Sequence, residues 1–192
     1  MLTWESILWN NYNYLGNIPT LDLLGSTTLA SAAASINFTG LPATYTDLMV
    51  VGSVKSASTA TGFINDSLHV QFNGVTAGNY QFAQIFNNGS SSPGVGFSTN
   101  QTSANVGSMW NSFTPNTPGA GNFWFWIPNY AGTTFYKNFE TVSYASDGTS
   151  AAALNITCGC LGSTVAAVSS MSFFFLSGSN LTAKSFISVY GF

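Results

Sequence analysis

Positive charge is almost absent from this 192-residue chain, whose only bases are Lys55, Lys137 and Lys184 and which contains no arginine. Charged residues make up 5% of the sequence, whereas they make up roughly a quarter of an average soluble domain. The formal net charge is -3. Because nucleic-acid binding depends on clustered Lys and Arg that neutralise phosphates, this composition argues against a nucleic-acid partner.

Long hydrophobic runs are absent as well. We find no window of the roughly 18 uninterrupted apolar residues that a membrane helix requires, so we predict no membrane association. The N-terminus has neither a basic start nor a small-residue cleavage site, and we therefore expect no signal peptide.

Cysteine is scarce, with Cys158 and Cys160 as the only two. Residues two apart in a strand share a face, and these follow Leu154 and Ile156 in an alternation whose apolar members we expect to face the core. We predict two small buried thiols, since free cysteine is among the most buried residue types. A disulfide between such strand neighbours is sterically poor, and a metal site would need further ligands.

No motif for catalysis is present. Hydrolysis by paired carboxylates needs two acids at a fixed separation, and none of the six acids lies in a recognisable motif. His69, the only histidine, falls on the polar side of an alternating segment, where we expect it on the solvated surface without a nucleophile partner. Asp47 precedes an apolar run, and we expect it to bond backbone there. We predict no enzymatic activity, no metal and no cofactor.

The chain does contain a regular series of short apolar runs separated by Gly, Pro, Asn and Ser. Residues 66–73 alternate most clearly, with Leu68, Val70 and Phe72 on the side expected to face inward. Residues 47–54 and 123–127 are apolar on both sides, which predicts strands covered by two layers. About nine or ten strands and no long helix after residue 26 predict an all-β fold, an antiparallel jelly-roll-like β-sandwich with an extended N-terminal arm.

Several local features follow from the same pattern. Residues 169–192 form two apolar runs around a Gly-Ser-Asn turn and predict a closing hairpin. Residues 87–100 are rich in Gly, Ser and Asn and predict a long loop. Residues 133–144 predict a strand on which Lys137 and Glu140 face outward.

Residues 1–26 differ from the rest because they concentrate large apolar side chains among asparagines. Such a terminus must be covered by something. One alternative is a strand or helix folded back onto its own domain, and the other, which we favour, is an arm that docks on a neighbouring subunit. We therefore divide the chain into an arm, 1–26, and a single β-sandwich domain, 27–192. The predicted docking residues are Trp4, Ile7, Leu8, Trp9, Tyr12 and Tyr14.

The remaining candidate site is aromatic and comprises Trp110, Trp124, Trp126 and Tyr130, which flank Gly- and Asn-rich segments. Sugar-binding surfaces stack rings on exposed aromatic side chains, so a glycan site is one interpretation. The other interpretation, which the contiguous run 123–127 favours, is that these residues fill the core or a subunit interface.

Five segments carry a resemblance to a known family. They are residues 44–53 (TYTDLMVVGS), 66–74 (DSLHVQFNG) with 79–80 (NY), 127–131 (IPNYA) with 136–137 (YK), 170–175 (SMSFFF), and 185–192 (SFISVYGF). Their pattern resembles small β-rich virion proteins of tailed bacteriophages, especially marine and cyanobacterial ones. The resemblance covers roughly residues 40–192 and implies a jelly-roll-like domain, often trimeric, that decorates a capsid or forms a module of a tail fibre or spike.

The functional hypothesis is a virion structural protein, a capsid decoration (cement) protein that stabilises the head across capsid subunits. Its expected partners are itself, as a homotrimer, and the major capsid protein or another virion protein, and its expected location is the virion, assembled in the host cytoplasm. The alternative is a receptor-binding module of a tail fibre or spike that recognises a host surface glycan. A secreted glycan-active enzyme is the weakest hypothesis, since it would need two carboxylates in one cleft.

Overall fold

A computed structural model describes residues 20–59, 65–88, 93–110, 119–146 and 152–192, without the side chains of Asn65, Asn88 and Trp110. The described residues form twelve β-strands and no helix. The strands are β1 (Asp22–Thr28), β2 (Ser35–Thr39), β3 (Leu48–Val54), β4 (Asn65–Phe72), β5 (Tyr80–Asn88), β6 (Gly94–Gln101), β7 (Ala104–Trp110), β8 (Ala120–Ile127), β9 (Lys137–Ser146), β10 (Ala152–Leu161), β11 (Ser170–Phe175) and β12 (Phe186–Gly191).

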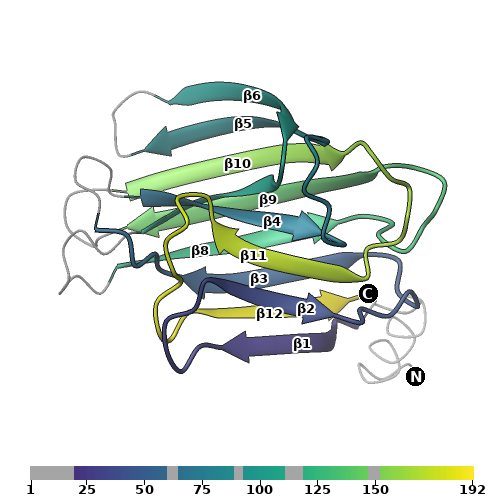
Figure 1. Ribbon diagram of the computed structural model, residues 1–192, viewed down its shortest axis with the longest axis horizontal. Helices are drawn as coiled ribbons and strands as arrows, with labels where there is room; N and C mark the ends of the chain where they lie inside the picture. Colours follow the sequence, from purple (N-terminus) through teal and green to yellow (C-terminus); the bar gives the residue numbers. More distant parts are fainter. Residues whose placement is uncertain (1–19, 60–64, 89–92, 111–118, 147–151) are drawn as a thin grey trace, which may run out of the picture.

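Two antiparallel sheets pack face to face, which confirms the predicted all-β sandwich (Figure 1). The larger sheet has eight strands in the order β1-β12-β3-β8-β9-β10-β5-β6, and the smaller has four in the order β2-β11-β4-β7. Four of the strand pairs are nested in the sequence, so that each pair encloses the next. They are β1 with β12, β2 with β11, β3 with β8 and β4 with β7. The hairpins β5–β6 and β9–β10 lie outside this nesting, and both extend the larger sheet.

The core lies between the sheets and is built from every second residue of the strands. Leu68, Val70 and Phe72 of β4 are fully buried, as their alternation predicted. The Phe72 ring contacts the rings of Tyr80 and Phe125 at centroid distances of 5.9 and 6.0 Å. Because burying one such side chain stabilises the fold by roughly 1.5–3 kcal/mol, this aromatic cluster holds the two sheets together.

The core also contains a polar region where β7 lies against β9 and β10. Thr141 of β9 donates to the carbonyl oxygens of Val106 and Trp124, at 2.8 and 2.9 Å. Asn155 and Thr157 of β10 are buried, and the Thr157 hydroxyl donates a hydrogen bond of 2.6 Å to the Asn155 amide oxygen. Because these hydroxyl and amide groups face inward, the apolar residues between them face outward.

Three local expectations were wrong. The two C-terminal strands do not form a hairpin, because β11 belongs to the smaller sheet and β12 to the larger one. The range 87–100, expected as a loop, contains the end of β5 and most of β6. Lys137 is buried rather than exposed, and its ammonium group donates to the carbonyl oxygens of Gly132 and Phe135 in the connection that precedes β9.

The assigned arm overlaps the sandwich, since β1 begins at Asp22 and pairs with β12. Residues 1–19, and with them the predicted docking residues Trp4, Ile7, Leu8, Trp9, Tyr12 and Tyr14, lie outside the described residues.

Candidate protein-protein interface

The larger sheet exposes a broad apolar surface on the side that faces away from the smaller sheet, which we call the outer sheet face. Its central row crosses six neighbouring strands, each residue paired with the next. The row is Val51, Trp124, Val142, Ile156, Ile85 and Val95. Every member of this row is apolar, so the outer sheet face is continuous across β3, β8, β9, β10, β5 and β6.

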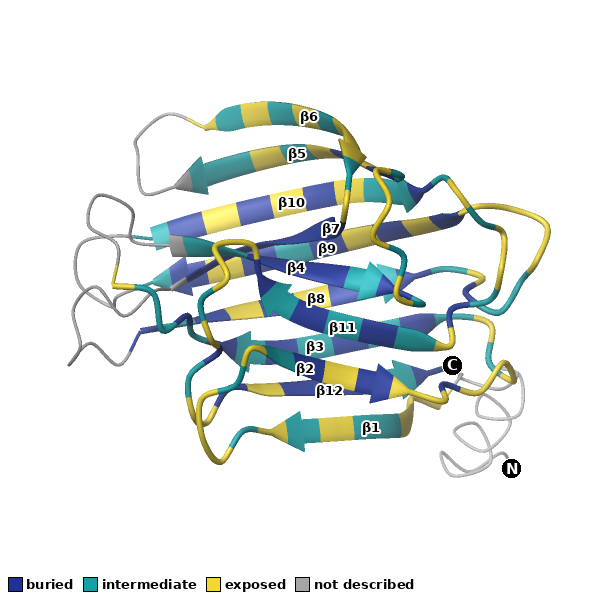
Figure 2. Cartoon of the chain, viewed as in Figure 1, coloured by how far each residue is buried: buried dark blue, intermediate teal, exposed yellow. Residues whose placement is uncertain are grey.

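Two flanking rows widen the outer sheet face. One consists of Met49, Trp126, Glu140, Cys158, Ala83 and Phe97, and the other of Ser53, Asn122, Tyr144, Leu154 and Asn87. The exposed fractions are 82% for Val95, 72% for Phe97, 56% for Ile85 and 50% for Tyr144. Figure 2 shows the resulting bands on β10, where exposed and buried residues alternate along the strand.

Single exposed apolar residues are common on protein surfaces, but here several large ones lie next to each other. Contiguous apolar patches of this kind mark interaction sites on soluble proteins. Two of the rows cross six strands, about 29 Å, the third crosses five, and together they span about 20 Å along the strands, a footprint of roughly 600 Å² that includes the polar residues in the flanking rows. That area is comparable to the ~800 Å² that one partner contributes to a standard protein-protein interface.

Charge is nearly absent from the outer sheet face, where Glu140 is the only Asp, Glu, Lys or Arg on the three rows. Glu140 lies directly opposite Cys158 in the ladder between β9 and β10. Burial, and then the Glu140 charge, raise the pKa of the Cys158 thiol. The thiol therefore stays protonated and the surface stays apolar at neutral pH.

The prediction of two buried thiols was wrong. Cys158 and Cys160 share a face, as expected, but Cys158 is exposed and Cys160 half-buried, and both are free. The same inversion applies to Leu154 and Ile156, which are 45% and 41% exposed. The alternation in β10 was correctly recognised, but its polar side faces the core, where β10 lies against β7 and where Thr157 donates a hydrogen bond to Asn155.

The structure places the four candidate aromatic residues in three different environments. Trp124 and Trp126 lie on the outer sheet face, and Trp124 is 38% exposed. The expectation that residues 123–127 are covered on both sides was therefore wrong for this face. Tyr130 is buried in the core and donates to the Pro42 carbonyl oxygen. Trp110 ends β7 in the other sheet, and its side chain lies outside the described residues.

Asp47 holds the Trp126 side chain in place at one end of the outer sheet face. Its carboxylate accepts a bond from the Trp126 indole nitrogen at 3.1 Å and one from the Asn129 backbone nitrogen at 2.9 Å. The prediction that Asp47 bonds backbone beside a strand start is confirmed. The second bond, which fixes the Trp126 ring, was not foreseen.

His69 is buried, contrary to the expectation of a solvated surface residue. Its Nδ1 lies 2.8 Å from the Ser103 hydroxyl, and its ring contacts Phe82 and Phe174. Desolvation lowers the pKa of His69 to about 4, so the imidazole is neutral at physiological pH. Ser103 is also buried, so this serine–histidine pair is closed to a substrate.

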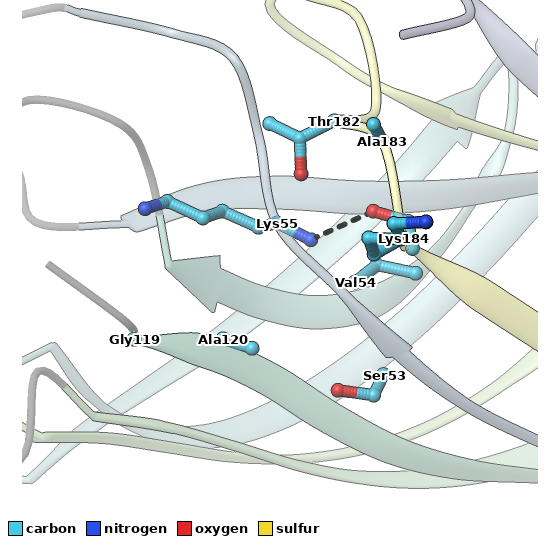
Figure 3. A pocket seen from close by; sticks show the side chains of 9 residues that line it. Ser53, Val54, Lys55, Gly119, Ala120, Thr182, Ala183 and Lys184 are labelled. Carbon is cyan, nitrogen blue, oxygen red and sulfur yellow. Dashed lines mark hydrogen bonds between the residues drawn. The ribbon is translucent and has the colours of Figure 1, made fainter. Parts of the chain in front are cut away.

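A pocket of about 250 Å³ lies at the end of β3, beside the start of β8 and the segment that precedes β12. Its lining includes Lys55 and Lys184, two of the three lysines in the sequence. Figure 3 shows the Lys55 side chain extending away from Lys184 rather than toward it. Because the two ammonium groups do not converge, this pocket does not form a two-point anion site.

The part of the chain that the structure describes contains no cluster of three or more His, Cys, Asp or Glu residues suited to a metal ion. It also contains no helix with the length and hydropathy needed to cross a membrane.

Comparisons with protein-family models, with curated proteins and with solved structures found no match to this chain. The outer sheet face is thus the feature on which a functional argument can be built.

Proposed function

We propose that this chain is a virion structural protein of a tailed bacteriophage, a capsid decoration protein that lays its outer sheet face on neighbouring capsid subunits. The observation that carries the proposal is the uncovered apolar row from Val51 to Val95, which crosses six strands. A surface with one carboxylate and several exposed large apolar side chains suits a lasting protein contact, since charged residues are depleted at interface centres. The proposal that the particle is a phage head rests on the resemblance of the sequence to small phage virion proteins.

The strand order supports the same proposal. We interpret the four nested pairs as a jelly roll into which the hairpins β5–β6 and β9–β10 are inserted. The eight nested strands already supply both layers of a sandwich. The two hairpins add four strands to the larger sheet alone, and they carry Val142, Ile156, Ile85 and Val95 of the central row. The inserted strands thus enlarge the outer sheet face, while their inner side packs on β7.

The test compares phage heads assembled without this chain before and after the purified full chain is added. We expect addition to raise the temperature at which the heads release their DNA. Ile156→Lys, which places a charge in the centre of the row, is expected to abolish this gain because a desolvated unpaired charge is costly. Val165→Lys is the matched control, since Val165 lies in a loop and has a similar exposed fraction, 38% against 41%.

Two results would contradict the proposal. One is absence of the chain from purified heads by mass spectrometry. The other is full stabilisation by Ile156→Lys, which would show that the outer sheet face does not dock.

A second candidate, a receptor-binding module of a tail fibre or spike, has one observation in its favour. Trp124 and Tyr144 are exposed, and the amide of Asn122 lies beside them, paired with Tyr144. Aromatic faces beside an amide can stack and bond a sugar ring. Loss of host adsorption in Trp124→Ala, together with a hit for the chain on a glycan array and no effect on head stability, would favour this candidate over the first.

A further inference from the structure

We infer that β6 is a pairing edge for a second copy of this chain, and that two copies join their larger sheets through antiparallel β6–β6 contact about a two-fold axis. This inference goes beyond the proposed function, because it names a partner for an edge rather than for the outer sheet face, and it proposes a two-fold pair in place of the homotrimer expected from the sequence. Among the described residues β6 pairs with β5 alone and ends the larger sheet. Its other side thus presents backbone N–H and C=O groups to which a further strand can bond.

The first five residues of β6, 94–98, lack the features by which proteins protect sheet edges. Charged residues, prolines and bulges usually block edge-to-edge pairing. The sequence of β6, GVGFSTNQ, contains no charged residue and no proline. Its irregularity falls toward the end of the strand, between the Phe82–Ser98 and Tyr80–Gln101 pairs, which leaves residues 94–98 regular.

The opposite edge of the same sheet differs. There β1 begins with Asp22, whose carboxylate accepts a bond from the Tyr45 hydroxyl, and its register with β12 shifts between Leu23 and Gly25. A charge and a bulge at this edge disfavour pairing. Both edges contain a register shift, but only β1 carries a charge, so β6 is the better suited of the two to a partner strand.

The residue pattern of β6 is complementary to itself. Val95 and Phe97 point to the outer sheet face, whereas Gly94, Gly96 and Ser98 point to the other side. A two-fold axis places identical strands antiparallel, so any register that preserves the two faces sets apolar residues beside apolar ones and small residues beside small ones. Val95 and Phe97 have the largest exposed fractions, 82% and 72%, among the large apolar side chains described.

Pairing at β6 would also connect two outer sheet faces. The central apolar row ends at Val95, on the edge strand. In the pair, the row of one copy meets the row of the other at β6, so the apolar surface becomes continuous across both copies. Two docking faces joined in one pair bind a shared partner more tightly than either alone, because the second contact becomes intramolecular.

The test measures the mass of the full chain by sedimentation over a wide range of concentrations. We expect a monomer-dimer equilibrium that Ser98→Lys weakens by about tenfold or more, since a two-fold axis brings each introduced charge near its own copy. Ser98 points away from the outer sheet face, so this variant leaves that face intact. Val95→Lys, at the most exposed position, is a second variant expected to have the same effect without loss of fold.

Two controls separate this inference from the proposed function. Leu23→Lys, on the protected β1 edge and 59% exposed, should leave the dimer unchanged. Ile156→Lys should abolish head stabilisation but preserve the dimer. A chain that is monomeric at every concentration, or a dimer that resists Ser98→Lys and Val95→Lys, would overturn the inference, as would a dimer that Ile156→Lys alone dissociates, since the second copy would then lie on the outer sheet face.

Amide hydrogen exchange adds an independent readout. In the dimer, the backbone amides of residues 94–98 that point away from β5 should exchange more slowly as the concentration rises. Unchanged exchange at concentrations where the mass is that of a dimer would place the contact elsewhere and overturn the inference.

Discussion

Gly107 in β7 and Ser143 in β9 bring the two sheets together at a point where the backbone of Gly107 packs directly on the Ser143 side chain. A Cβ atom on Gly107 would overlap the Ser143 hydroxyl, and Gly107 has a φ of +143°, which L side chains rarely adopt. The Ser143 hydroxyl is buried and has no hydrogen-bond partner among the described residues. The sheet separation in the polar region of the core thus depends on the absence of a side chain at this position.

Gly107→Ala should lower the free energy of unfolding by about 2 kcal/mol or more, since it combines overpacking with backbone strain. Urea denaturation measures the change. Gly74→Ala is the control because Gly74 also has positive φ, +68°, but open space around the position of a Cβ, and it should cost only about 1 kcal/mol. Equal losses in the two variants would show that contact with Ser143 is unimportant.

Buried His69 should make stability depend on pH between about 4 and 6.5. Desolvation lowers its folded-state pKa to about 4 from 6.5, so the unfolded chain binds the proton first as pH falls. Its contribution is present above pH 6.5 and is lost toward pH 4, which predicts about 2 kcal/mol less stability at pH 5 than at pH 7.

Urea denaturation at both pH values, in the chain and in His69→Gln, tests this dependence. His69 is the only histidine, so the variant removes the imidazole titration and should flatten the slope. A slope unchanged in His69→Gln would assign the effect to the carboxylates instead.

Asp47→Ala should release the Trp126 ring and lower the free energy of unfolding by about 1–2 kcal/mol, because two hydrogen bonds to a carboxylate are lost. The indole N–H resonance of Trp126 should move upfield in an NMR spectrum. Asp22→Ala, which removes one exposed bond from the Tyr45 hydroxyl, should cost about 0.5 kcal/mol or less. An indole resonance that does not move would contradict the bond to Asp47.

Cys158 should react slowly with alkylating reagents at neutral pH although its residue is exposed. Partial desolvation of the thiol and the Glu140 charge raise its pKa, and the thiolate is the nucleophile. In a Cys160→Ser background, Glu140→Gln should move the pH profile of the alkylation rate to lower pH. Alkylation followed by mass spectrometry measures the rate. A profile unaffected by Glu140→Gln would show that the carboxylate does not act on the thiol.

The alternation of apolar residues predicted the strands well but not always the direction in which they face. In β4 the pattern of Leu68, Val70 and Phe72 correctly identified the core. In β10 the equivalent pattern of Leu154 and Ile156 identified the wrong face, because Asn155 and Thr157 find polar partners inside. Local sequence specifies which residues share a face, whereas the opposing layer decides which face is buried.

The pairing of the strands was harder to predict from the sequence than the direction in which they face. The runs that form β11 and β12 were correctly recognised as strands, but their short connection suggested a hairpin. The chain instead crosses between layers there, so that β11 pairs with β2 and β4, and β12 with β1 and β3. In β6, glycine and asparagine obscured the strand signal, and the strand is formed through its pairing with β5.

The sequence by itself determined an all-β chain with few charges and a regular series of short apolar runs, because composition and two-residue periodicity are properties of the chain alone. Only the tertiary structure decided that Ile156, Ile85 and Val95 lie in one exposed row while Asn155, Thr157 and His69 are buried. The physical reason is that burial results from contacts between strands distant in sequence. The polar groups that β7 brings to the core, and the two hairpins that widen one sheet, are such contacts.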